Sequence, residues 1–333
     1  NLIVSKKKYP QVFTSWQYLY DILLSKINKN NYFLGDECID IEKKQNTTTC
    51  YFKNGKKITA DIVIIANGIR SNLKKYVDKN KPEYAGYVGW RGLIEESKLS
   101  KETSKIISDY FCFVLPKNQQ FLTYPVAGDG KKGLKTGNRR INWLWYKPVD
   151  KKTLKELLTG KSNKIYEHGI PPFEIKEVFI ESLINEGKEK LPSTMFELIL
   201  KTKQILLQPI FDLRSDKMFK KNIITIGDCA FTVRPHAGMG VTKAALDCYD
   251  LIAALKNSNV NNLSQTLNKW EKKRIEEGIF LLNKSRDMGF YIKDDAKIQM
   301  PTNMTVLNET AVSIKDINLY PNKMSILDIN SLY

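Results

Sequence analysis

Residues 223–247 read IITIGDCAFTVRPHAGMGVTKAALD, and this stretch decides the fold that we expect for the whole chain. Its first four residues are apolar or β-branched, as in a strand that is buried on both faces of a parallel sheet. A glycine-rich loop follows, and residues 241–255 then have the small and apolar residues of a helix. The stretch therefore predicts a buried strand, a tight loop and a helix of an α/β domain.

The loop has the residue types of a site for a negatively charged group. Asp228 follows the strand directly, where a carboxylate can accept hydrogen bonds from ribose or ribityl hydroxyls. Pro235, Gly238 and Gly240 predict a tight turn whose backbone N–H groups point outward at a helix N-terminus. Glycine there lets the backbone approach a flat ring without a Cβ in the way. An ordinary strand-to-helix loop is the alternative, but the full spacing G-D-x6-P-x2-G-x-G favours the binding site.

The rest of the chain is organised around a second apolar strand. Residues 61–66 (DIVIIA) form a continuous apolar run, which predicts a strand buried on both faces of a parallel sheet. The run ends in Asn67-Gly68, before a short helix at 71–77. Between the two strands, residues 84–146 are aromatic and strand-like, which predicts a mostly antiparallel sheet. This order is typical of one α/β domain with a second domain inserted into it.

Other segments have simpler patterns. Residues 14–28 have the apolar spacing of an amphipathic helix, with Thr14 or Ser15 as its cap. The remaining expected elements are strands at 38–43, 47–52 and 56–59, a hairpin at Asn54-Gly55, lysine-rich helices within 151–204, a long helix at 264–290 and a weakly specified tail from 297.

Composition narrows the function classes. The 333 residues include 53 Lys plus Arg against 36 Asp plus Glu, a formal net charge of +17, but the basic residues are mostly lysines dispersed over every expected helix. This distribution, without a nucleic-acid-binding motif, argues against a nucleic-acid partner. Five scattered cysteines without a CxxC pair, and only two histidines, argue against a disulfide framework and a metal site. No apolar run approaches the roughly 20 residues that span a bilayer, so we expect a soluble protein with no membrane partner. The cysteine usage fits a reducing cytosol, so we expect a cytoplasmic location.

Several motifs, in order along the chain, resemble one family of flavoenzymes. Residues 227–247 resemble the second flavin signature of the class A FAD-dependent aromatic hydroxylases, the p-hydroxybenzoate hydroxylase-like family, and residues 61–71 resemble their middle signature. The segments at 14–16 (TSW), 84–93 (YAGYVGWRGL) and 142–146 (NWLWY) are similar to the 2,6-dihydroxypyridine 3-monooxygenase branch. The likeness extends from residue 11 to about residue 290.

The resemblance implies a function and a domain plan. It implies an FAD- and NAD(P)H-dependent monooxygenase that hydroxylates an electron-rich aromatic or N-heteroaromatic ring through a flavin C4a-hydroperoxide. A small aromatic substrate and O2 are the implied partners, and a homodimer is a candidate assembly. The implied domains are a partial, Rossmann-like FAD-binding domain at 1–82 and 206–256, a substrate domain of mostly antiparallel sheet plus helices at 83–205, and C-terminal helices and a tail at 257–333.

The site residues follow from the matched motifs. His236 is the catalytic candidate, as a base or hydrogen-bond partner, and the alternative is that it only packs within the loop. The implied cofactor-binding residues are Gly227, Asp228, Pro235, Gly238, Met239, Gly240, Val241, Asn67 and Gly68. The candidates for facing substrate are Tyr124, Trp143 and Tyr146, although single aromatic residues at strand spacing more often belong to a core. Arg91 and Arg234 are further candidates for pairing with an anionic group, and for Arg91 a structural salt bridge is the alternative.

The chain also departs from the family pattern. Asn67, Ser15 and Phe231 stand where the family commonly has Asp, Arg and His, although Phe231 suits the dihydroxypyridine branch. No G-x-G-x-x-G motif, which holds the ADP pyrophosphate in the family, and no initiator Met occur in the sequence. We therefore expect an N-terminal portion to be missing and this chain alone to hold FAD weakly. A flavin enzyme of the same fold with another outcome, such as epoxidation or antibiotic inactivation, and a truncated non-catalytic remnant remain open.

Overall fold

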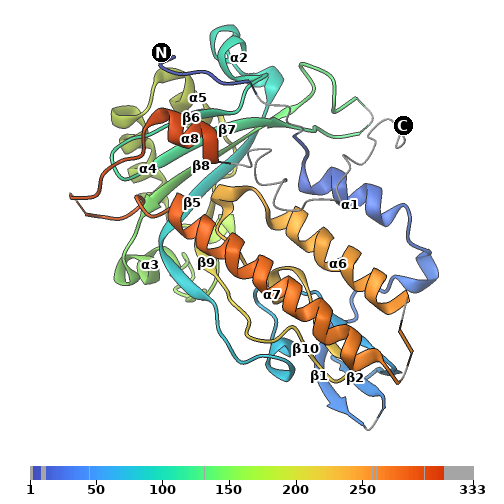
Figure 1. The fold of residues 1–333 in the computed structure, drawn as a ribbon. Coiled ribbons are helices and arrows are strands. Elements are labelled where there is room, and N and C mark those ends of the chain that lie inside the picture. Colours follow the sequence, from blue (N-terminus) through green and yellow to red (C-terminus); the bar gives the residue numbers. More distant parts are fainter. Residues whose placement is uncertain are drawn as a thin grey trace.

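The computed structural model describes residues 3–8, 13–44, 46–130, 132–256, 258–259, 261–295 and 297–310. Within these ranges the strands form three sheets, ordered β1-β2-β3, β10-β11-β4 and β6-β7-β8-β5-β9 (Figure 1). Helices pack against the second and third of these sheets, which confirms the expected α/β fold class. In the described part of the chain, no helix combines the length and the apolar character needed to cross a bilayer.

The small sheet carries the two apolar strands of the sequence. β4 (Val63–Ile65) and β11 (Ile223–Thr225) pair in parallel, and β10 (Phe219–Lys220) adds an antiparallel strand. All three residues of β11 are buried, as expected. The expectation that β4 is buried on both faces is wrong, because β4 is the edge of the sheet and the Ile64 side chain is 46% exposed.

The N-terminal region holds a helix and a meander. α1 (Trp16–Leu24) is shorter than the expected 14–28, and Ser15 caps it by accepting a hydrogen bond from the Tyr18 backbone N–H. None of its residues is buried. The meander consists of β1 (Cys38–Lys43), β2 (Thr48–Phe52) and β3 (Lys57–Ala60), with Gly55 at a φ of +84° in the expected hairpin turn.

The five-stranded sheet forms the largest layer, and all its pairs are antiparallel, as expected. Its strands are β5 (Glu83–Glu95), β6 (Cys112–Val114), β7 (Gln120–Val126), β8 (Arg140–Pro148) and β9 (Leu206–Asp212). Because β9 pairs with β5, the sheet extends beyond the domain boundary that we expected at residue 205.

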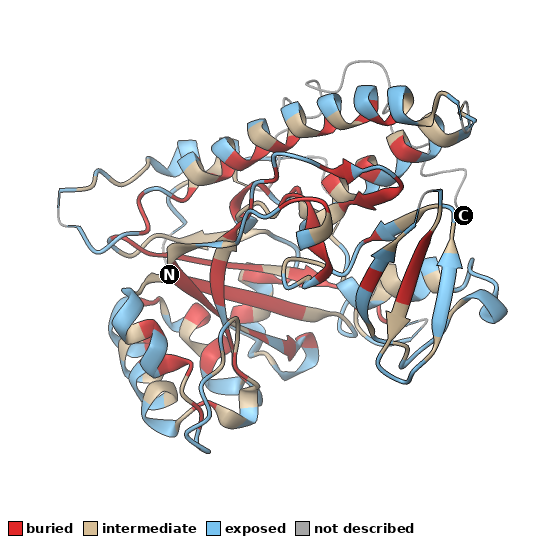
Figure 2. Cartoon of the chain, turned by 90° about the horizontal axis from the view of Figure 1, so that it is seen from below, coloured by how far each residue is buried: buried red, intermediate tan, exposed pale blue. Residues whose placement is uncertain are grey.

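The two faces of this sheet are covered by different parts of the chain. On one face, Trp90, Trp143 and Trp145 pack against apolar residues of the helices between β8 and β9. These helices are α3 (Lys151–Leu157), α4 (Glu177–Lys190) and α5 (Ser193–Lys201), with the 3-10 helix η4 (Pro172–Glu174) at the expected Pro171-Pro172 break. On the other face, Tyr87 and Tyr146 pack near Tyr291. Figure 2 shows the buried residues concentrated in the sheet and along the inner sides of the helices.

Two long helices follow β11. α6 (Gly240–Lys256) and α7 (Leu263–Met288) pack together and bury Leu251, Leu267 and Trp270 against the small sheet. The other helical elements are α2 (Lys101–Ile107), α8 (Asn303–Glu309) and the 3-10 helices η1 (Lys29–Asn31), η2 (Leu73–Tyr76), η3 (Glu96–Lys98), η5 (Gly227–Cys229) and η6 (Pro235–Ala237). α8 lies in the tail that the sequence specified weakly, and Thr302 caps it.

Candidate functional site

The carboxyl ends of β4 and β11 bring two of the sequence motifs to one edge of the small sheet. Because the strands are parallel, the residues that follow them leave the sheet at the same edge. Gly68 and Gly227 have φ values of +81° and +62°, in the left-handed region that favours glycine. The structure therefore places Asn67-Gly68 and Gly227-Asp228 beside each other, as the matched motifs require.

Asp228 presents its carboxyl group at this edge and is exposed. Desolvation by the surrounding protein raises the pKa of Asp228, while the Lys243 ammonium acts in the opposite direction. A carboxylate in this position is able to accept hydrogen bonds from the hydroxyls of a bound ligand.

The loop at 235–240 turns its side chains inward and its backbone outward. Ala237 and Met239 are buried and pack against Leu281 of α7. Gly238 has a φ of +66° at the end of η6 and is exposed, as Pro235 is. The side chain of Met239 therefore anchors the loop, so that Met239 is able to contact a ligand through its backbone N–H but not through its thioether.

α6 begins directly behind this loop. Its first intrahelical hydrogen bond runs from Lys243 N–H to Met239 O at 2.8 Å, so the N–H groups of residues 240–242 precede the helical ladder. A Cβ built on Gly240 would meet no atom within 4 Å, and Val241 is 59% exposed. The helix N-terminus is thus open to a flat ligand and carries the positive end of the helix dipole toward it.

His236 lies inside this loop rather than on its surface. Its side chain is 2% exposed, its Nε2 is 2.7 Å from the Tyr87 hydroxyl, and its Nδ1 is 3.2 Å from Gln120 Oε1. Since the amide oxygen only accepts, Nδ1 carries the proton and Nε2 accepts from Tyr87. Burial, with Arg234 nearby, lowers the pKa of His236 to about 3. This environment favours the alternative in which His236 is a neutral hydrogen-bonding residue that holds the loop on the sheet.

The buried histidine has a measurable consequence for stability. Between its unfolded pKa of 6.5 and its folded pKa of about 3, the unfolded chain binds a proton on His236 that the folded protein does not. The free energy of unfolding therefore falls as the pH is lowered through this window. In urea unfolding below pH 6.5, we expect the free energy of unfolding of His236→Gln to fall less steeply with decreasing pH than that of the parent protein. The two slopes should differ by up to about 1.4 kcal/mol per pH unit. Parallel stability curves for the two proteins would contradict the assignment.

The candidate substrate residues divide between the two faces of the five-stranded sheet. Tyr146 packs on His236 with ring centroids 4.9 Å apart, and half-buried Tyr124 lies on the same face, stacked on Phe13 at 5.5 Å. Trp143 lies on the opposite face and its indole N–H donates to Thr202 Oγ1 at 2.8 Å. The expectation that Trp143 faces a substrate together with Tyr146 is therefore wrong, because residues three apart in a strand point to opposite faces.

Other candidates have structural partners. The Arg234 Nε donates to buried Asp212 at 2.8 Å, so this arginine is paired within the protein. Arg91 is half-buried on β5, and its Nη1 donates to Gln208 Oε1 at 3.1 Å, a neutral partner in place of the salt bridge considered above. Phe231 is buried against α7, where a Cβ added to Gly278 would lie 2.8 Å from its ring.

Sequence reasoning missed the residues that hold His236. Tyr87 and Gln120 come from β5 and β7, far from the loop in sequence. The signal common to both residues is strand alternation. Tyr146 pairs with Gly89 of β5 and with Gln120 of β7, so these three residues share one face of the sheet. Tyr87 lies on the same face because it is two residues from Gly89. Gly89 leaves room for the Tyr146 ring, which would lie 3.1 Å from an added Cβ.

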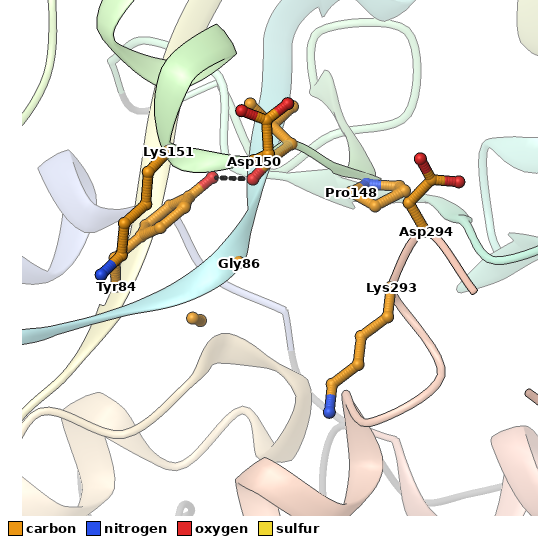
Figure 3. A pocket seen from close by; sticks show the side chains of 9 residues that line it. Tyr84, Gly86, Pro148, Asp150, Lys151, Lys293 and Asp294 are labelled. Atoms are coloured by element: carbon orange, nitrogen blue, oxygen red, sulfur yellow. Dashed lines mark hydrogen bonds between the residues drawn. The ribbon is translucent and has the colours of Figure 1, made fainter.

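A surface pocket lies elsewhere in the molecule. It has a volume of about 300 Å³ and is formed by residues at one end of β5 and β8 together with Lys293 and Asp294, as Figure 3 shows. In it the Tyr84 hydroxyl donates to Val149 O at 2.9 Å. No residue that we expected in the functional site lines this pocket.

Comparisons with known proteins agree with this geometry. Residues 84–212, which comprise nearly the whole extent of the five-stranded sheet, match a family model described as FAD binding domain-like. The solved structure of 2,6-dihydroxypyridine-3-hydroxylase from Arthrobacter nicotinovorans superimposes with a TM-score of 0.80 at 25% identity, over 90% of this chain and 74% of that one. HpxO from Klebsiella pneumoniae, complexed with FAD and uric acid, superimposes with a TM-score of 0.65 at 16% identity, over 88% of this chain and 65% of that one.

These similarities define the class: the chain has the fold of the FAD-dependent aromatic monooxygenases and is related to them in sequence. A particular relative that matches most of the chain is 2,6-dihydroxypyridine 3-monooxygenase of Paenarthrobacter nicotinovorans, which is 26% identical over 282 residues. The match spans 83% of this chain and 68% of that relative. The resemblance stated from the motifs is thereby confirmed.

Proposed function

We propose that this protein is an FAD- and NAD(P)H-dependent monooxygenase that hydroxylates an electron-rich aromatic or N-heteroaromatic ring. The observation that carries the proposal is the open N-terminus of α6 at Gly240, beside the exposed Asp228 carboxyl group. The relative named above as 2,6-dihydroxypyridine 3-monooxygenase supports the reaction class.

The residues at this edge fit one part of the FAD molecule. Asp228 would accept hydrogen bonds from ribityl hydroxyls, with Asn67 and Gly68 on the neighbouring strand end. The backbone N–H groups from Met239 to Val241 would face the pyrimidine end of the ring, where negative charge develops on reduction. When bound, FAD reduced by NAD(P)H would react with O2 and supply the oxygen that is inserted into the substrate.

The domain plan is part of the same proposal. Residues 1–82 and 206–256 would form the FAD-binding side, and residues 83–205 the substrate side, except that β9 (Leu206–Asp212) belongs to the substrate-side sheet; residues 257–333 would be C-terminal helices and a tail. The hydrogen bonds of His236 to Tyr87 and Gln120 support this plan, because they join the cofactor loop to the substrate-side sheet. A fixed distance between the two sides keeps the reacting atoms oriented.

The sheet face toward the loop would form the substrate wall. Tyr124 and Tyr146 lie on it, together with half-buried Arg91 and buried Asn142, whose Nδ2 has no hydrogen-bond partner among the described residues. A buried donor without a partner favours a substrate that carries an acceptor oxygen or nitrogen. Apolar and aromatic neighbours would keep water out of the site.

The two faces of the sheet make opposite predictions for its aromatic residues. We expect Tyr124→Ala to raise KM for the aromatic substrate by about tenfold, the effect of about 1.4 kcal/mol of lost contact. Trp143→Phe should lower the free energy of unfolding by about 1–3 kcal/mol, because the Thr202 hydroxyl loses its indole donor and keeps only its bond to Leu198 O, and should leave KM unchanged. Steady-state kinetics and urea unfolding of both variants separate the effects. A raised KM in the Trp143 variant would contradict the assigned faces.

Substrate-stimulated NAD(P)H oxidation tests the proposed reaction. The protein expressed from its complete coding sequence is assayed with dihydroxypyridines and hydroxybenzoates, and the products are identified by mass. We expect stimulation by at least one ring, with one oxygen atom added to it. Turnover without oxygen insertion would support another outcome of the same fold, and no stimulation by any ring would contradict the proposal.

A further inference from the structure

A closed ring of buried hydrogen bonds holds the glycine that precedes Asp228. The Gly227 N–H donates to Asp247 Oδ2 at 2.9 Å, and the Lys243 ammonium donates to Gly227 O at 3.0 Å. Lys243 also donates to Asp247 Oδ2 at 3.0 Å, which closes the ring. Both backbone polar groups of Gly227 are thus bound by charged side chains from α6.

A third charged residue fixes this ring from α7. The Arg274 Nε donates to the second oxygen of Asp247 at 2.8 Å. Lys243, Asp247 and Arg274 are each 1% exposed. Buried charges persist only where they are paired and hydrogen-bonded, so this set is a costly feature for a fold to keep.

The target of this set is a backbone position, not the core. Gly227 has a φ of +62°, and its turn aims the next residue, Asp228, at the edge of the sheet. An apolar packing of α6 on α7 would hold the helices together equally well. It would not bind the Gly227 N–H, and the Gly227 C=O would keep only the Ala230 and Phe231 N–H groups as donors.

We propose that Lys243, Asp247 and Arg274 form a clamp that positions Asp228 for the ribityl hydroxyls of the cofactor. These are positioning residues, since they act through the backbone of Gly227. The assignment rests on the proposed function, because it takes FAD as the ligand of Asp228.

The clamp is tested first without any cofactor, by hydrogen exchange at the Gly227 amide. Urea unfolding gives the change in global stability of each variant, and exchange rates are compared after this change is subtracted. On that basis we expect Lys243→Met to accelerate this exchange at least tenfold relative to Leu267→Val, a core variant of α7. Lys273→Met, which removes a partly exposed ammonium paired with Asp250 on the same helix pair, should leave the exchange unchanged. Equal acceleration in the Lys243 and Leu267 variants would overturn the clamp.

The cofactor role is then tested by FAD affinity in the same proteins. We expect the dissociation constant to rise about tenfold in Lys243→Met and to change less than twofold in Leu267→Val and Lys273→Met. Equal affinities in Lys243→Met and Leu267→Val, with FAD bound by the parent protein, would overturn the positioning role alone. A parent protein that binds no FAD would overturn the proposed function and the positioning role with it, whatever the exchange shows.

Discussion

Gly240→Leu should weaken FAD binding at least 100-fold and leave the fold intact. An added Cβ at this position meets no protein atom within 4 Å, so the leucine side chain is free to occupy the space in front of the α6 N-terminus. We expect the free energy of unfolding to change by less than about 0.5 kcal/mol, as for other surface substitutions. The same side chain would keep a flat ring away from the N–H groups of residues 240–242. We expect at least a 100-fold weaker affinity, about 2.7 kcal/mol, measured by flavin fluorescence titration.

Ala245→Leu is the matched control for this substitution. Ala245 is exposed on the same helix, beyond its first turn. This variant adds the same apolar bulk to α6 but away from the loop, and its FAD affinity should equal that of the parent. Equal affinities in the Gly240 and Ala245 variants would show that the cofactor does not approach the helix N-terminus.

Asp212→Ala should be the most destabilising single change considered for this protein. The Asp212 carboxylate is 1% exposed and accepts from Arg234 Nε at 2.8 Å and from Arg286 at 2.5 and 3.0 Å. It ties the end of β9 to the loop and to α7. Its removal leaves two arginines without their buried partner, which typically costs about 3–5 kcal/mol.

Glu83→Ala removes a second carboxylate that pairs with Arg286, this one at the surface. Glu83 lies 3.3 Å from Arg286 Nη2 and its side chain is 77% exposed, so this pair should contribute about 1 kcal/mol or less. Urea unfolding of the two variants gives the comparison. Similar losses of stability would mean that burial does not strengthen the Asp212 network.

The local part of the site was predictable from the sequence because it lies in one continuous stretch. The strand, the glycine turn and the helix at 223–256 follow from apolar runs and from glycine, which report directly on backbone geometry. The parallel pairing of β4 with β11 agrees with the two apolar runs, which are typical of strands in a parallel sheet. The exposure of Ile64 was not predictable, because it depends on which strand forms the edge of the sheet.

The rest of the site depends on contacts between distant segments. The partners of His236 come from strands more than 100 residues earlier, at separations of 149 and 116 residues. Strand alternation indicates the sheet face that Tyr87 and Gln120 share, but not that the loop at 235–240 packs on this face. The error at Trp143 was avoidable, since strand alternation alone places it on the face opposite to Tyr146. The clamp on Gly227 combines both cases. Lys243 and Asp247 are one helical turn apart, but Arg274, the second partner of Asp247, is on another helix.

The visible absorption spectrum of the purified protein tests the central claim most directly. The protein is expressed from its complete coding sequence, as the parent and as the Gly240→Leu and Ala245→Leu variants, and each spectrum is recorded after desalting. We predict the bands of oxidised flavin in the parent and in the Ala245 variant, and their loss in a folded Gly240 variant. A colourless parent that also fails to bind added FAD, or a Gly240 variant with the full flavin spectrum, would contradict the account.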